Sequence, residues 1–297
     1  MKGNQKNKTI LIVDGNNLLF RCYFKFAGMF SKSGKPSSVL FGYPYVLKSL
    51  ITKFKPYKVY NVFDGSRSKK RLEILPTYKQ KDPKLGLDIE DLRNQKSLLM
   101  KILPAFNTYV VWEKYQEADD LIYLLTRKLK DKYDLIIVSS DKDFNQLITP
   151  TIICHNPNKG IEITEKNIKH RFGYEPHQCV DYLIMDGDSS DNIPGYKGMG
   201  EKRITDFLNQ YASIAYYLSN NLQYKKLNNA LLAEVYKRNK YLIDLAYYYR
   251  KFNRGKKVPY IGKPKFDRNK IWRFASIYDI NTFNKKDFLQ TYKTLNQ

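Results

Sequence analysis

Carboxylate residues follow apolar runs at several places in the first half of this chain. Three runs of β-like composition each lead into an aspartate: Thr9–Val13 into Asp14, Lys58–Phe63 into Asp64, and Asp134–Ser140 into Asp141 with Asp143 close behind. A fourth run, Thr108–Trp112, is followed by Glu117, Asp119 and Asp120. Carboxylates that meet in one place repel one another unless a cation lies among them. Because oxygen-only ligand sets favour Mg²⁺ or Mn²⁺, the pattern predicts a metal-dependent active site.

A parallel sheet would bring these acids together. Continuous Val-, Ile- and Leu-rich runs that alternate with helical segments predict a parallel sheet buried on both faces. Ligands of such sheets bind outside the carboxyl ends of the strands, so acids at those ends converge on one edge. We therefore expect an α/β fold with a central, mostly parallel sheet flanked by helices. The helical candidates in this half are Leu18–Phe30, Tyr43–Phe54, Asp88–Leu103 and Glu117–Lys130.

The composition favours a polyanionic substrate. The 297 residues carry a formal net charge of +23, and lysines and arginines release counterions from a nucleic-acid backbone. The alternative is a merely basic protein whose lysine content reflects an AT-rich genome. Three scattered cysteines fit no disulfide framework and, with three histidines, no convincing zinc set. The sequence shows no signal peptide and no apolar run near the roughly 20 residues of a membrane span, so we expect a soluble, cytoplasmic protein.

Two further segments have unusual composition. Residues 65–105 begin with a basic run, continue through Tyr78, Lys79 and Lys81, and regain a helical pattern after Asp82-Pro83. This charged excursion between two strands predicts an insertion over the sheet edge rather than part of the core. Residues 187–203 combine Gly187-Asp188-Ser189-Ser190-Asp191-Asn192 with a Gly198-x-Gly200 turn. Two short helices joined by such a turn present backbone N–H groups to phosphates, to which Lys197, Lys202 and Arg203 add charge.

In these motifs the chain resembles the 5′-nuclease family. The family comprises phage flap endonucleases, 5′–3′ exonucleases and the N-terminal nuclease domain of bacterial DNA polymerases. The resemblance extends from about Ile10 to about Ile243, and the last fifty residues fit the compact phage members better than a polymerase. It is carried by Val13-Asp14-Gly15, Phe63-Asp64, Tyr78-Lys79, Glu117-Ala118-Asp119-Asp120, Ser140-Asp141-Lys142-Asp143 and Gly187-Asp188-Ser189-Ser190-Asp191-Asn192-Ile193-Pro194-Gly195.

The resemblance implies roles for individual residues. Around a first metal it places Asp14, Asp64, Glu117, Asp119 and Asp120, and around a second Asp141, Asp143, Asp188 and Asp191. Lys79 matches a lysine that approaches the scissile phosphate, Tyr78 an aromatic that stacks on an unpaired base, and Arg21 a basic residue near the active site. The glycine-rich hairpin resembles a helix–hairpin–helix-like element that often binds K⁺ through main-chain carbonyls. By motif position those carbonyls belong to Met185, Asp186, Pro194, Tyr196 and Met199.

Two positions depart from the family pattern. Asp82 replaces a common arginine, and we expect Lys81 or Lys84 to compensate in binding phosphate. Asp186 replaces a usually apolar residue and is interpreted as a solvated side chain, with an outer metal ligand as the alternative.

The sequence thus predicts a Mg²⁺-dependent 5′-nuclease that cuts flaps and nicked or gapped duplexes by a two-metal mechanism, with RNA primers as a further candidate substrate. We expect a nuclease core over residues 1–180 with a helical arch at about 65–105. A helical DNA-binding region over 181–297 would carry the hairpin at about 187–209. The expected protein is a monomer that acts on branched or 5′-ended DNA, or an RNA–DNA hybrid, beside a DNA polymerase. A PIN-type ribonuclease and a non-catalytic branched-DNA-binding protein remain the alternatives.

Overall fold

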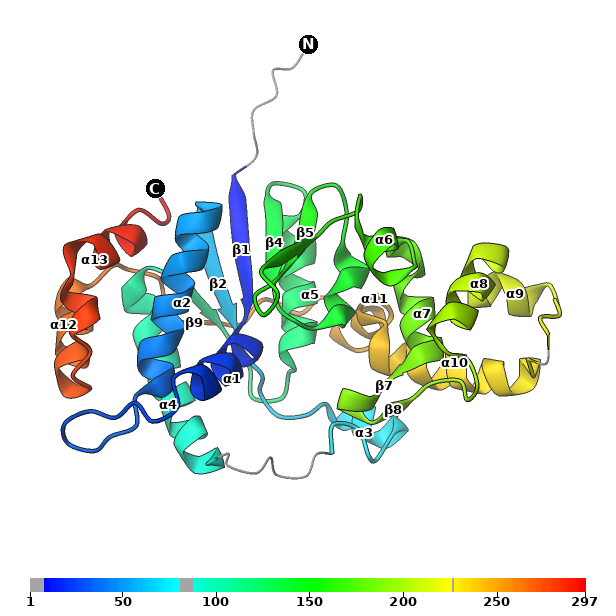
Figure 1. The fold of residues 1–297 in the computed structure, drawn as a ribbon, viewed down its shortest axis with the longest axis horizontal. Helices are drawn as coiled ribbons and strands as arrows, with labels where there is room; N and C mark the ends of the chain where they lie inside the picture. The colour runs from blue at the N-terminus through cyan, green and yellow to red at the C-terminus, as the bar shows by residue number, and fades with distance from the viewer. Residues whose placement is uncertain (1–7, 81–87, 226) are drawn as a thin grey trace, which may run out of the picture.

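A seven-stranded sheet forms the centre of the protein (Figure 1). The structure is a computed structural model that describes residues 8–80, 88–225 and 227–297. The five strands from β5 to β3 pair in parallel, and the edge strands β6 and β9 pair antiparallel to their neighbours. In spatial order the strands are β6 (Ile161–Ile163), β5 (Ile152–Asn156), β4 (Asp134–Val138), β1 (Thr9–Asp14), β2 (Lys58–Val62), β3 (Tyr109–Val111) and β9 (Tyr260–Ile261). The prediction of a mostly parallel α/β sheet is therefore confirmed.

Helices cover both faces of the sheet, because alternate strand residues point to opposite sides. Ile10 and Ile12 enter one hydrophobic core, whereas Leu11 and Val13 enter the other. The first core also receives side chains from α5 (Ala118–Leu129), α7 (Cys179–Asp186), α8 (Glu201–Tyr211), α9 (Ile214–Ser219), α10 (Asn229–Ile243) and α11 (Leu245–Tyr248). The second receives side chains from α1 (Gly15–Lys25), α2 (Ser38–Phe54), α4 (Ile89–Ile102), α12 (Arg268–Ile277) and α13 (Lys286–Lys293).

The other elements are short and lie mainly in the connections. They are α3 (Lys69–Ile74), α6 (Ile168–Phe172), the two-stranded β7 (Gly187–Asp188) and β8 (Ile193–Pro194), the 3-10 turns η1 (Leu103–Phe106), η2 (Lys142–Leu147), η3 (Pro176–Gln178), η4 (Ser189–Asp191) and η6 (Asn281–Asn284), and the π-helical turn η5 (Tyr249–Asn253). Within the described ranges, every helix is too short or too polar to span a bilayer.

Helix α4 belongs to the core layer, which corrects the interpretation of residues 65–105 as one insertion outside the core. Leu92, Leu99 and Ile102 recur on one side of α4 and are buried in the core shared with α2. An amphipathic helix is stabilised when its apolar stripe packs against another apolar surface, and here α2 provides that surface. Of the expected arch before α4, the described residues 65–80 lie outside this layer, and residues 81–87 lie outside the described residues.

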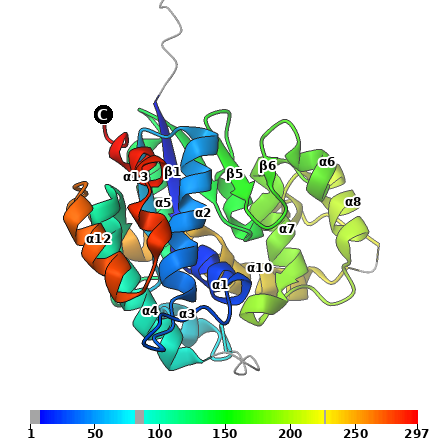
Figure 2. The same ribbon diagram turned by 60° about the vertical axis from the view of Figure 1, so that its left-hand side comes forward.

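The end of the chain returns to the sheet, which differs from the expected single helical region over 181–297. Strand β9 pairs with β3 through Val110 and Ile261. Phe288 and Tyr292 of α13 are buried in the core that contains α2. In both ribbon views α12 and α13 lie at the opposite end of the molecule from α8 (Figure 1 and Figure 2).

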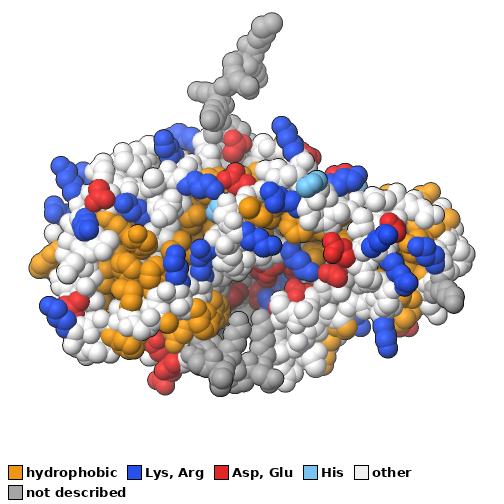
Figure 3. Space-filling view, viewed as in Figure 1, with side chains coloured by type: hydrophobic (Ala, Val, Ile, Leu, Met, Phe, Trp, Pro, Cys, Tyr) orange, Lys and Arg blue, Asp and Glu red, His pale blue; other side chains and the backbone are white. Residues whose placement is uncertain are grey.

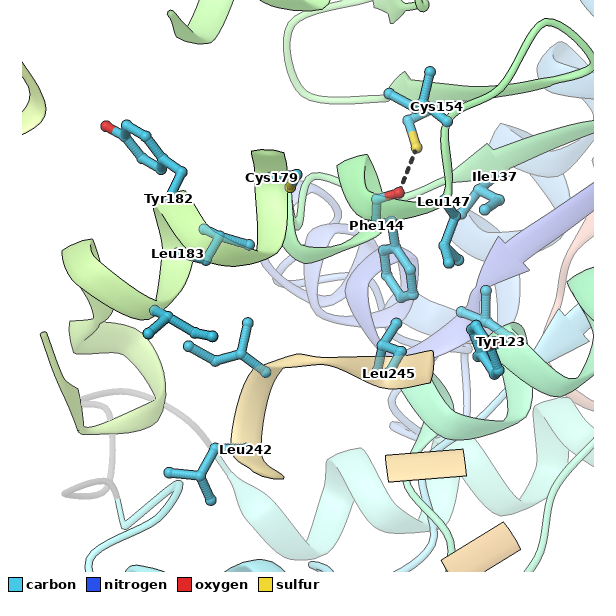
Figure 4. Close-up of a cluster of buried hydrophobic side chains, with 14 of the residues drawn as sticks. Tyr123, Ile137, Phe144, Leu147, Cys154, Cys179, Tyr182, Leu183, Leu242 and Leu245 are labelled. Atoms are coloured by element: carbon cyan, nitrogen blue, oxygen red, sulfur yellow. Dashed lines mark hydrogen bonds between the residues drawn. The ribbon is translucent and has the colours of Figure 1, made fainter. Parts of the chain in front are cut away.

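The first core is continuous from the sheet to α7 and α11 (Figure 4). Phe144 of η2 lies fully buried between Ile137 of β4 and Leu245 of α11 in this cluster. The Sγ of Cys154 donates to the main-chain oxygen of Phe144 at 3.4 Å. All three cysteines are buried and free, in agreement with the absence of a disulfide framework in the sequence. This packing fixes the chain directly behind Asp141 and Asp143.

Candidate active site

An open cavity of about 520 Å³ lies at the carboxyl edge of the sheet. Six of the nine carboxylates predicted from the sequence line it: Asp14, Asp64, Asp119, Asp141, Asp188 and Asp191. We call it the acid pocket. Figure 3 shows acidic side chains recessed in a hollow of the surface, with lysine and arginine side chains distributed around it. Five separate segments of the chain therefore bring their acids to one place, and three of these acids, Asp14, Asp64 and Asp141, stand at or just after the carboxyl ends of parallel strands.

Two of these aspartates are fixed by the helical turns that follow their strands. Asp14 ends β1 and caps α1, and its Oδ1 accepts from the Asn17 N–H at 3.0 Å. Its Oδ2 accepts from the Ser139 hydroxyl at 2.8 Å. Asp141 caps η2 in the same manner, with its Oδ1 accepting from the Asp143 N–H at 2.9 Å. A carboxylate at a helix start satisfies an otherwise unpaired N–H, so these caps also orient the acids.

Asp64 is held from two directions at the end of β2. Its carboxylate accepts from the Asn16 side-chain amide and from the Ala118 N–H, both at 2.6 Å. Its main-chain oxygen accepts from Trp112 Nε1 at 3.0 Å and from Lys96 Nζ at 2.8 Å. The four donors come from separate parts of the chain, so the position of Asp64 depends on the packing of all of them.

The glycine-rich segment brings Asp188 and Asp191 to the pocket. Asp188 accepts from the Ser190 N–H at 2.7 Å and lies beside Gly187, whose φ is +76°. A Cβ at Gly187 would lie 2.4 Å from the Gly195 nitrogen, so glycine is required where β7 and β8 pair. This close pairing follows α7 directly, and both aspartates line the same pocket as Asp14 and Asp64.

Lys79 lies among the acids. Its Nζ is 2.9 Å from Glu117 Oε2, 3.3 Å from Asp119 Oδ2 and 3.5 Å from Asp191 Oδ2. Its main chain has a φ of +51° and its N–H donates to the Asp191 oxygen at 2.9 Å. The ammonium group thus stands where the carboxylates are most crowded, and their charges raise its pKa well above the usual value despite burial.

Burial and the crowding of negative charge raise the pKa values of three aspartates at the site. Burial and the charges of Asp119 and Asp64 raise the pKa of Asp14 to about 8. Burial and Asp119 raise the pKa of Asp141 to about 7, and burial and Asp141 raise that of Asp143 well above its usual value. The Oδ1 of Asp143 is buried and, within the described part of the chain, has no hydrogen-bond partner.

These observations fit divalent cations. A buried carboxylate oxygen without a donor, in a set of oxygen ligands that repel one another, is the chemistry that Mg²⁺ or Mn²⁺ relieves. As the side chains stand, no three acidic, histidine or cysteine residues of the described ranges converge closely enough to form a ligand group. The hydrogen bonds to backbone N–H groups and the ammonium of Lys79 keep the carboxylates apart.

Glu117 and Asp120 do not line the pocket, in contrast to the prediction that both surround the first metal. Arg71, whose side chain is 1% exposed, donates to the two carboxylate oxygens of Asp120 at 2.8 and 2.9 Å. Glu117 accepts from the Ser68 N–H at 2.7 Å and lies 3.3 Å from Arg71. Although burial alone would raise it, Arg71 and Lys79 hold the pKa of Glu117 at about 2. Both acids face the base of the segment that crosses the sheet edge.

Tyr78 and Arg21 do not line the acid pocket either. The Tyr78 side chain is 2% exposed and its hydroxyl donates to Glu117 at 2.8 Å, so its ring offers no face to a base in this structure. Arg21 donates to the Asn158 side chain at 3.0 Å and is not part of the pocket lining. Asp186 is paired with Lys142 at 2.9 Å rather than simply solvated.

The sequence interpretation missed three residues of the pocket. Asn16 and Asn17 follow Asp14 directly, and Asn17 Nδ2 donates to the Ser140 hydroxyl at 2.7 Å. Phe20, one turn later on α1, lines the pocket and is 37% exposed. The signal was present in the Asp14-Gly15-Asn16-Asn17 run and in the repeat of phenylalanine at 20 and 24, on the outer side of a helix that starts at the site.

The predicted duplex-binding turn is exposed. Gly198, with a φ of +87°, and Gly200, which caps α8, have no other atoms within 4 Å of an added Cβ. Lys197, Lys202 and Arg203 are exposed around this turn, and Arg203 donates to the Gly198 oxygen at 2.9 Å. Lys81, Asp82 and Lys84 lie outside the described residues.

The carbonyls implied for potassium are largely occupied. The Pro194 oxygen accepts from Arg238 at 2.6 Å and from Asn239 at 2.9 Å. The Met185 oxygen accepts from the Tyr196 N–H at 2.7 Å, and the Tyr196 oxygen from the Met199 N–H at 3.2 Å. The positive charge of Arg238 already borders this set and disfavours a second cation there. The potassium site stays a prediction.

Comparisons with known proteins agree with this geometry. Residues 9–173 match the family described as 5′-3′ exonuclease, N-terminal resolvase-like domain, and residues 174–248 match 5′-3′ exonuclease, C-terminal SAM fold. The chain is 32% identical over 214 residues to a 5′-3′ exonuclease of Aquifex aeolicus, which covers 72% of this chain and 73% of the relative. It is 30% identical over 217 residues to DNA polymerase I of Bacillus subtilis, covering 70% of this chain and 24% of the polymerase.

The fold is similar to that of solved nucleases. The bacteriophage T5 flap endonuclease, in a pseudo-enzyme-product complex with DNA and metal ions, superimposes with a TM-score of 0.66 at 21% identity, over 96% of this chain and all of the other. Because the identity is low, this likeness concerns the fold alone. It includes residues beyond 248, where the match to the family ends.

Proposed function

The chain belongs to the 5′–3′ exonuclease family of metal-dependent nucleases that act on DNA, and on that premise we propose that the acid pocket is its active site. The proposed reaction is hydrolysis of phosphodiester bonds at 5′ flaps and in nicked or gapped duplexes, with RNA primers as a further substrate. One observation carries the assignment. Six aspartates from five segments of the chain line one cavity that also contains Lys79, and the neighbouring Asp143 has a buried oxygen without a donor among the described residues.

Divalent metal ions are the proposed cofactors, with Mg²⁺ or Mn²⁺ favoured by the oxygen-only ligands. We assign Asp14, Asp64 and Asp119 to one ion and Asp141, Asp143, Asp188 and Asp191 to the other. When bound, two such ions lower the pKa of the attacking water and stabilise the leaving oxygen. Glu117 and Asp120 are assigned a different role, because Arg71 and Tyr78 already engage them. They hold the base of the segment that crosses the sheet edge.

Lys79 is proposed to move its charge from carboxylate to phosphate. In the structure its ammonium is shared by Glu117, Asp119 and Asp191. With the charge of the aspartates offset, the ammonium would be available to a phosphate in the pocket, where it would stabilise the negative charge on the phosphoryl oxygens in the transition state. Because Tyr78 is buried, we propose that the exposed ring of Phe20 provides the stacking surface for the base beside the scissile bond.

Binding of duplex DNA is assigned to the glycine-rich turn. The exposed Gly198 and Gly200 allow a phosphate to approach the start of α8, and Lys202 and Arg203 follow at once. We further propose that the first part of the nuclease core ends near residue 180, that the DNA-binding helices follow it, and that the end of the chain from β9 onward completes the core. We also propose that the protein works as a monomer in the cytoplasm of a bacterium or phage-infected cell, beside a DNA polymerase.

The test is cleavage of a 5′-flap DNA with Mg²⁺ by the wild type and by Asp141→Ala. We expect Asp141→Ala to lose cleavage and to keep its affinity for the same DNA, because removing a carboxylate lessens the repulsion of phosphate. Asp131→Ala, which removes an exposed carboxylate behind α5, is the matched control and should cleave as the wild type does. Wild-type turnover by Asp141→Ala would refute the assignment. Cleavage of single-stranded RNA alone would favour a PIN-type ribonuclease, and binding without cleavage a non-catalytic protein.

A further inference from the structure

A second cavity, of about 600 Å³, shares Asp64 with the acid pocket. Its walls come from three places that follow the carboxyl ends of β2 and β3 or lie beside them: Gly65 and Ser66, Trp112 and Lys114, and Ile261 of β9. Its remaining wall is one side of α4. The volume lies within the roughly 300–1,000 Å³ of cavities that hold small organic groups. We call it the Trp112 cavity.

The helical periodicity of α4 explains why basic side chains form that wall. The lining residues of α4 are Arg93, Lys96, Ser97, Met100 and Lys101, which follow the spacing i, i+3, i+4, i+7, i+8 of a single helix face. Leu92 and Leu99 lie on the adjacent face and are buried in the core. The core therefore fixes the rotation of α4, and that rotation turns three basic side chains toward the cavity.

The cavity combines an apolar floor with a cationic rim. Trp112, Met100 and Ile261 supply the apolar and aromatic surface. The rim is formed by Arg93, Lys96, Lys101 and Lys114, and none of these four forms an ion pair with a carboxylate in the described ranges. An aromatic face beside unpaired cations is the combination with which proteins bind single-stranded nucleic acid, through base stacking and backbone charge.

The cavity is linked to the acid pocket through Asp64. The carboxylate of Asp64 is held by Asn16 and Ala118 and lines the acid pocket. Its main-chain oxygen accepts from Trp112 Nε1 and Lys96 Nζ, both of which line the Trp112 cavity. A group in the Trp112 cavity therefore contacts the residues that position Asp64, and the two cavities meet at this residue.

We propose that the Trp112 cavity binds an unpaired nucleotide of the 5′ single strand, with its base against Trp112 and Met100 and its phosphates on Arg93 and Lys101. This subsite rests on the proposed nuclease function and adds to it a place where the flap is held. An acidic peptide with an apolar side chain would meet similar chemistry, but it would not explain why the cavity shares Asp64 with the acid pocket.

Trp112 itself can report occupancy. The chain has two tryptophans, and Trp272 is 57% exposed on α12. Trp272→Phe therefore leaves Trp112 as the sole tryptophan. Its fluorescence is measured in EDTA with three DNA probes on one duplex: a flap of ten thymidines, a flap of ten abasic sites, and a nick without a flap. We expect strong quenching with the thymidine flap alone, because stacking on Trp112 needs a base. Equal quenching by the abasic flap, or by a peptide of aspartates ending in phenylalanine, would overturn the proposal.

The rim is tested by salt dependence. Arg93→Ala/Lys101→Ala should lower the slope of log affinity against log salt by about 1.4 for the thymidine flap, since each phosphate contact on a single strand contributes about 0.7. The slope for the nick without a flap should not change. Lys130→Ala/Lys132→Ala removes the same charge from two exposed lysines behind α5 and is the matched control. Equal effects of the two double variants on the flap would overturn the proposal.

Cleavage with Mg²⁺ separates this subsite from the nuclease function. The nick without a flap does not need the Trp112 cavity, so its cleavage reports the acid pocket alone. Cleavage of the nick together with unquenched Trp112 fluorescence on the thymidine flap would overturn the flap subsite and leave the nuclease. Loss of cleavage on every 5′-ended DNA by the wild type would overturn both. Cleavage with flap-specific quenching and a flap-specific salt effect would support the subsite.

Discussion

Replacing Arg71 by methionine should destabilise the protein severely, because this guanidinium neutralises two buried carboxylates. Arg71 is 1% exposed and donates to both oxygens of Asp120 at 2.8 and 2.9 Å. It also lies 3.3 Å from Glu117 and 3.9 Å above the ring of Tyr248. Methionine keeps much of the aliphatic volume and removes the charge, so the change isolates the ionic contribution.

The expected magnitude follows from the burial of all three charged groups. Removing one partner of a buried ion pair costs about 3–5 kcal/mol, because the other charge is left uncompensated. At roughly 2–4 °C per kcal/mol for domains of somewhat smaller size, this corresponds to a fall in Tm of roughly 6–20 °C. Adding Asp120→Asn to Arg71→Met removes one of the orphaned charges and should recover about 1–3 kcal/mol.

The assay is urea unfolding of the wild type, the two single variants and the double variant in EDTA, from which the coupling energy is calculated. Lys70→Met is the matched control, because Lys70 pairs with Glu73 at 2.9 Å on the surface and such pairs contribute about 0–1 kcal/mol. The reasoning is refuted if Arg71→Met costs no more than Lys70→Met. It is also refuted if Asp120→Asn alone abolishes cleavage without changing the free energy of unfolding, since Asp120 would then serve the reaction directly.

Three further predictions concern ions and substrate entry. In the metal-free folded protein the pKa of Asp14 is raised to about 8 and that of Asp141 to about 7. The folded protein therefore keeps protons that the unfolded chain releases near pH 4, so the free energy of unfolding should fall as the pH rises from about 5 to 8. Mg²⁺ should therefore raise the Tm more at pH 8 than at pH 5, and an equal or opposite difference in thermal unfolding would contradict this. Exchanging K⁺ for Na⁺ at constant ionic strength should change duplex affinity by less than about twofold, because Arg238 already contacts the Pro194 oxygen; a tenfold change would contradict this. If residues 65–105 enclose the flap, a protein block on its 5′ end should slow cleavage only when it is attached before the enzyme binds, whereas equal rates in both orders would show side entry.

The central strands could be predicted because each is a continuous apolar run that ends in a polar residue. The expected run Lys58–Phe63 and the observed β2, Lys58–Val62, differ by one residue. Strand β9 gave no such signal, since two residues, Tyr260 and Ile261, cannot show a period. Helix α4 was located within a residue at each end, but a periodic apolar stripe does not reveal which surface it will bury. Its place in the core layer therefore required the structure.

The sequence predicted where the acidic residues lie along the chain better than it predicted which way their side chains point. Glu117 and Asp120 are three residues apart and share one side of the start of α5, whereas Asp119 lies well around the helix from that side. One helix start cannot aim all three at the same pocket. Asp119 faces the acid pocket, and the other two face Arg71. Nothing in the sequence marks Arg71 as the buried one among the basic residues of its run, so the roles of Glu117 and Asp120 could not be separated without coordinates.

The clustering of carboxylates that suits the acid pocket to metal ions also destabilises the folded protein when no ion is bound. Carboxylates packed for cations repel one another when none is bound, and the raised pKa values of Asp14 and Asp141 express that cost. The protein counters this repulsion with neutral donors, such as Ser139 at Asp14 and Asn16 at Asp64, and with the ammonium group of Lys79. A buried arginine such as Arg71 would occupy the space between the carboxylates if it lay in the acid pocket, and its ion pairs would keep it there. Arg71 thus fixes the carboxylates of Glu117 and Asp120, and under the proposed mechanism Lys79 would compensate Asp119 and Asp191 until ions and phosphate bind.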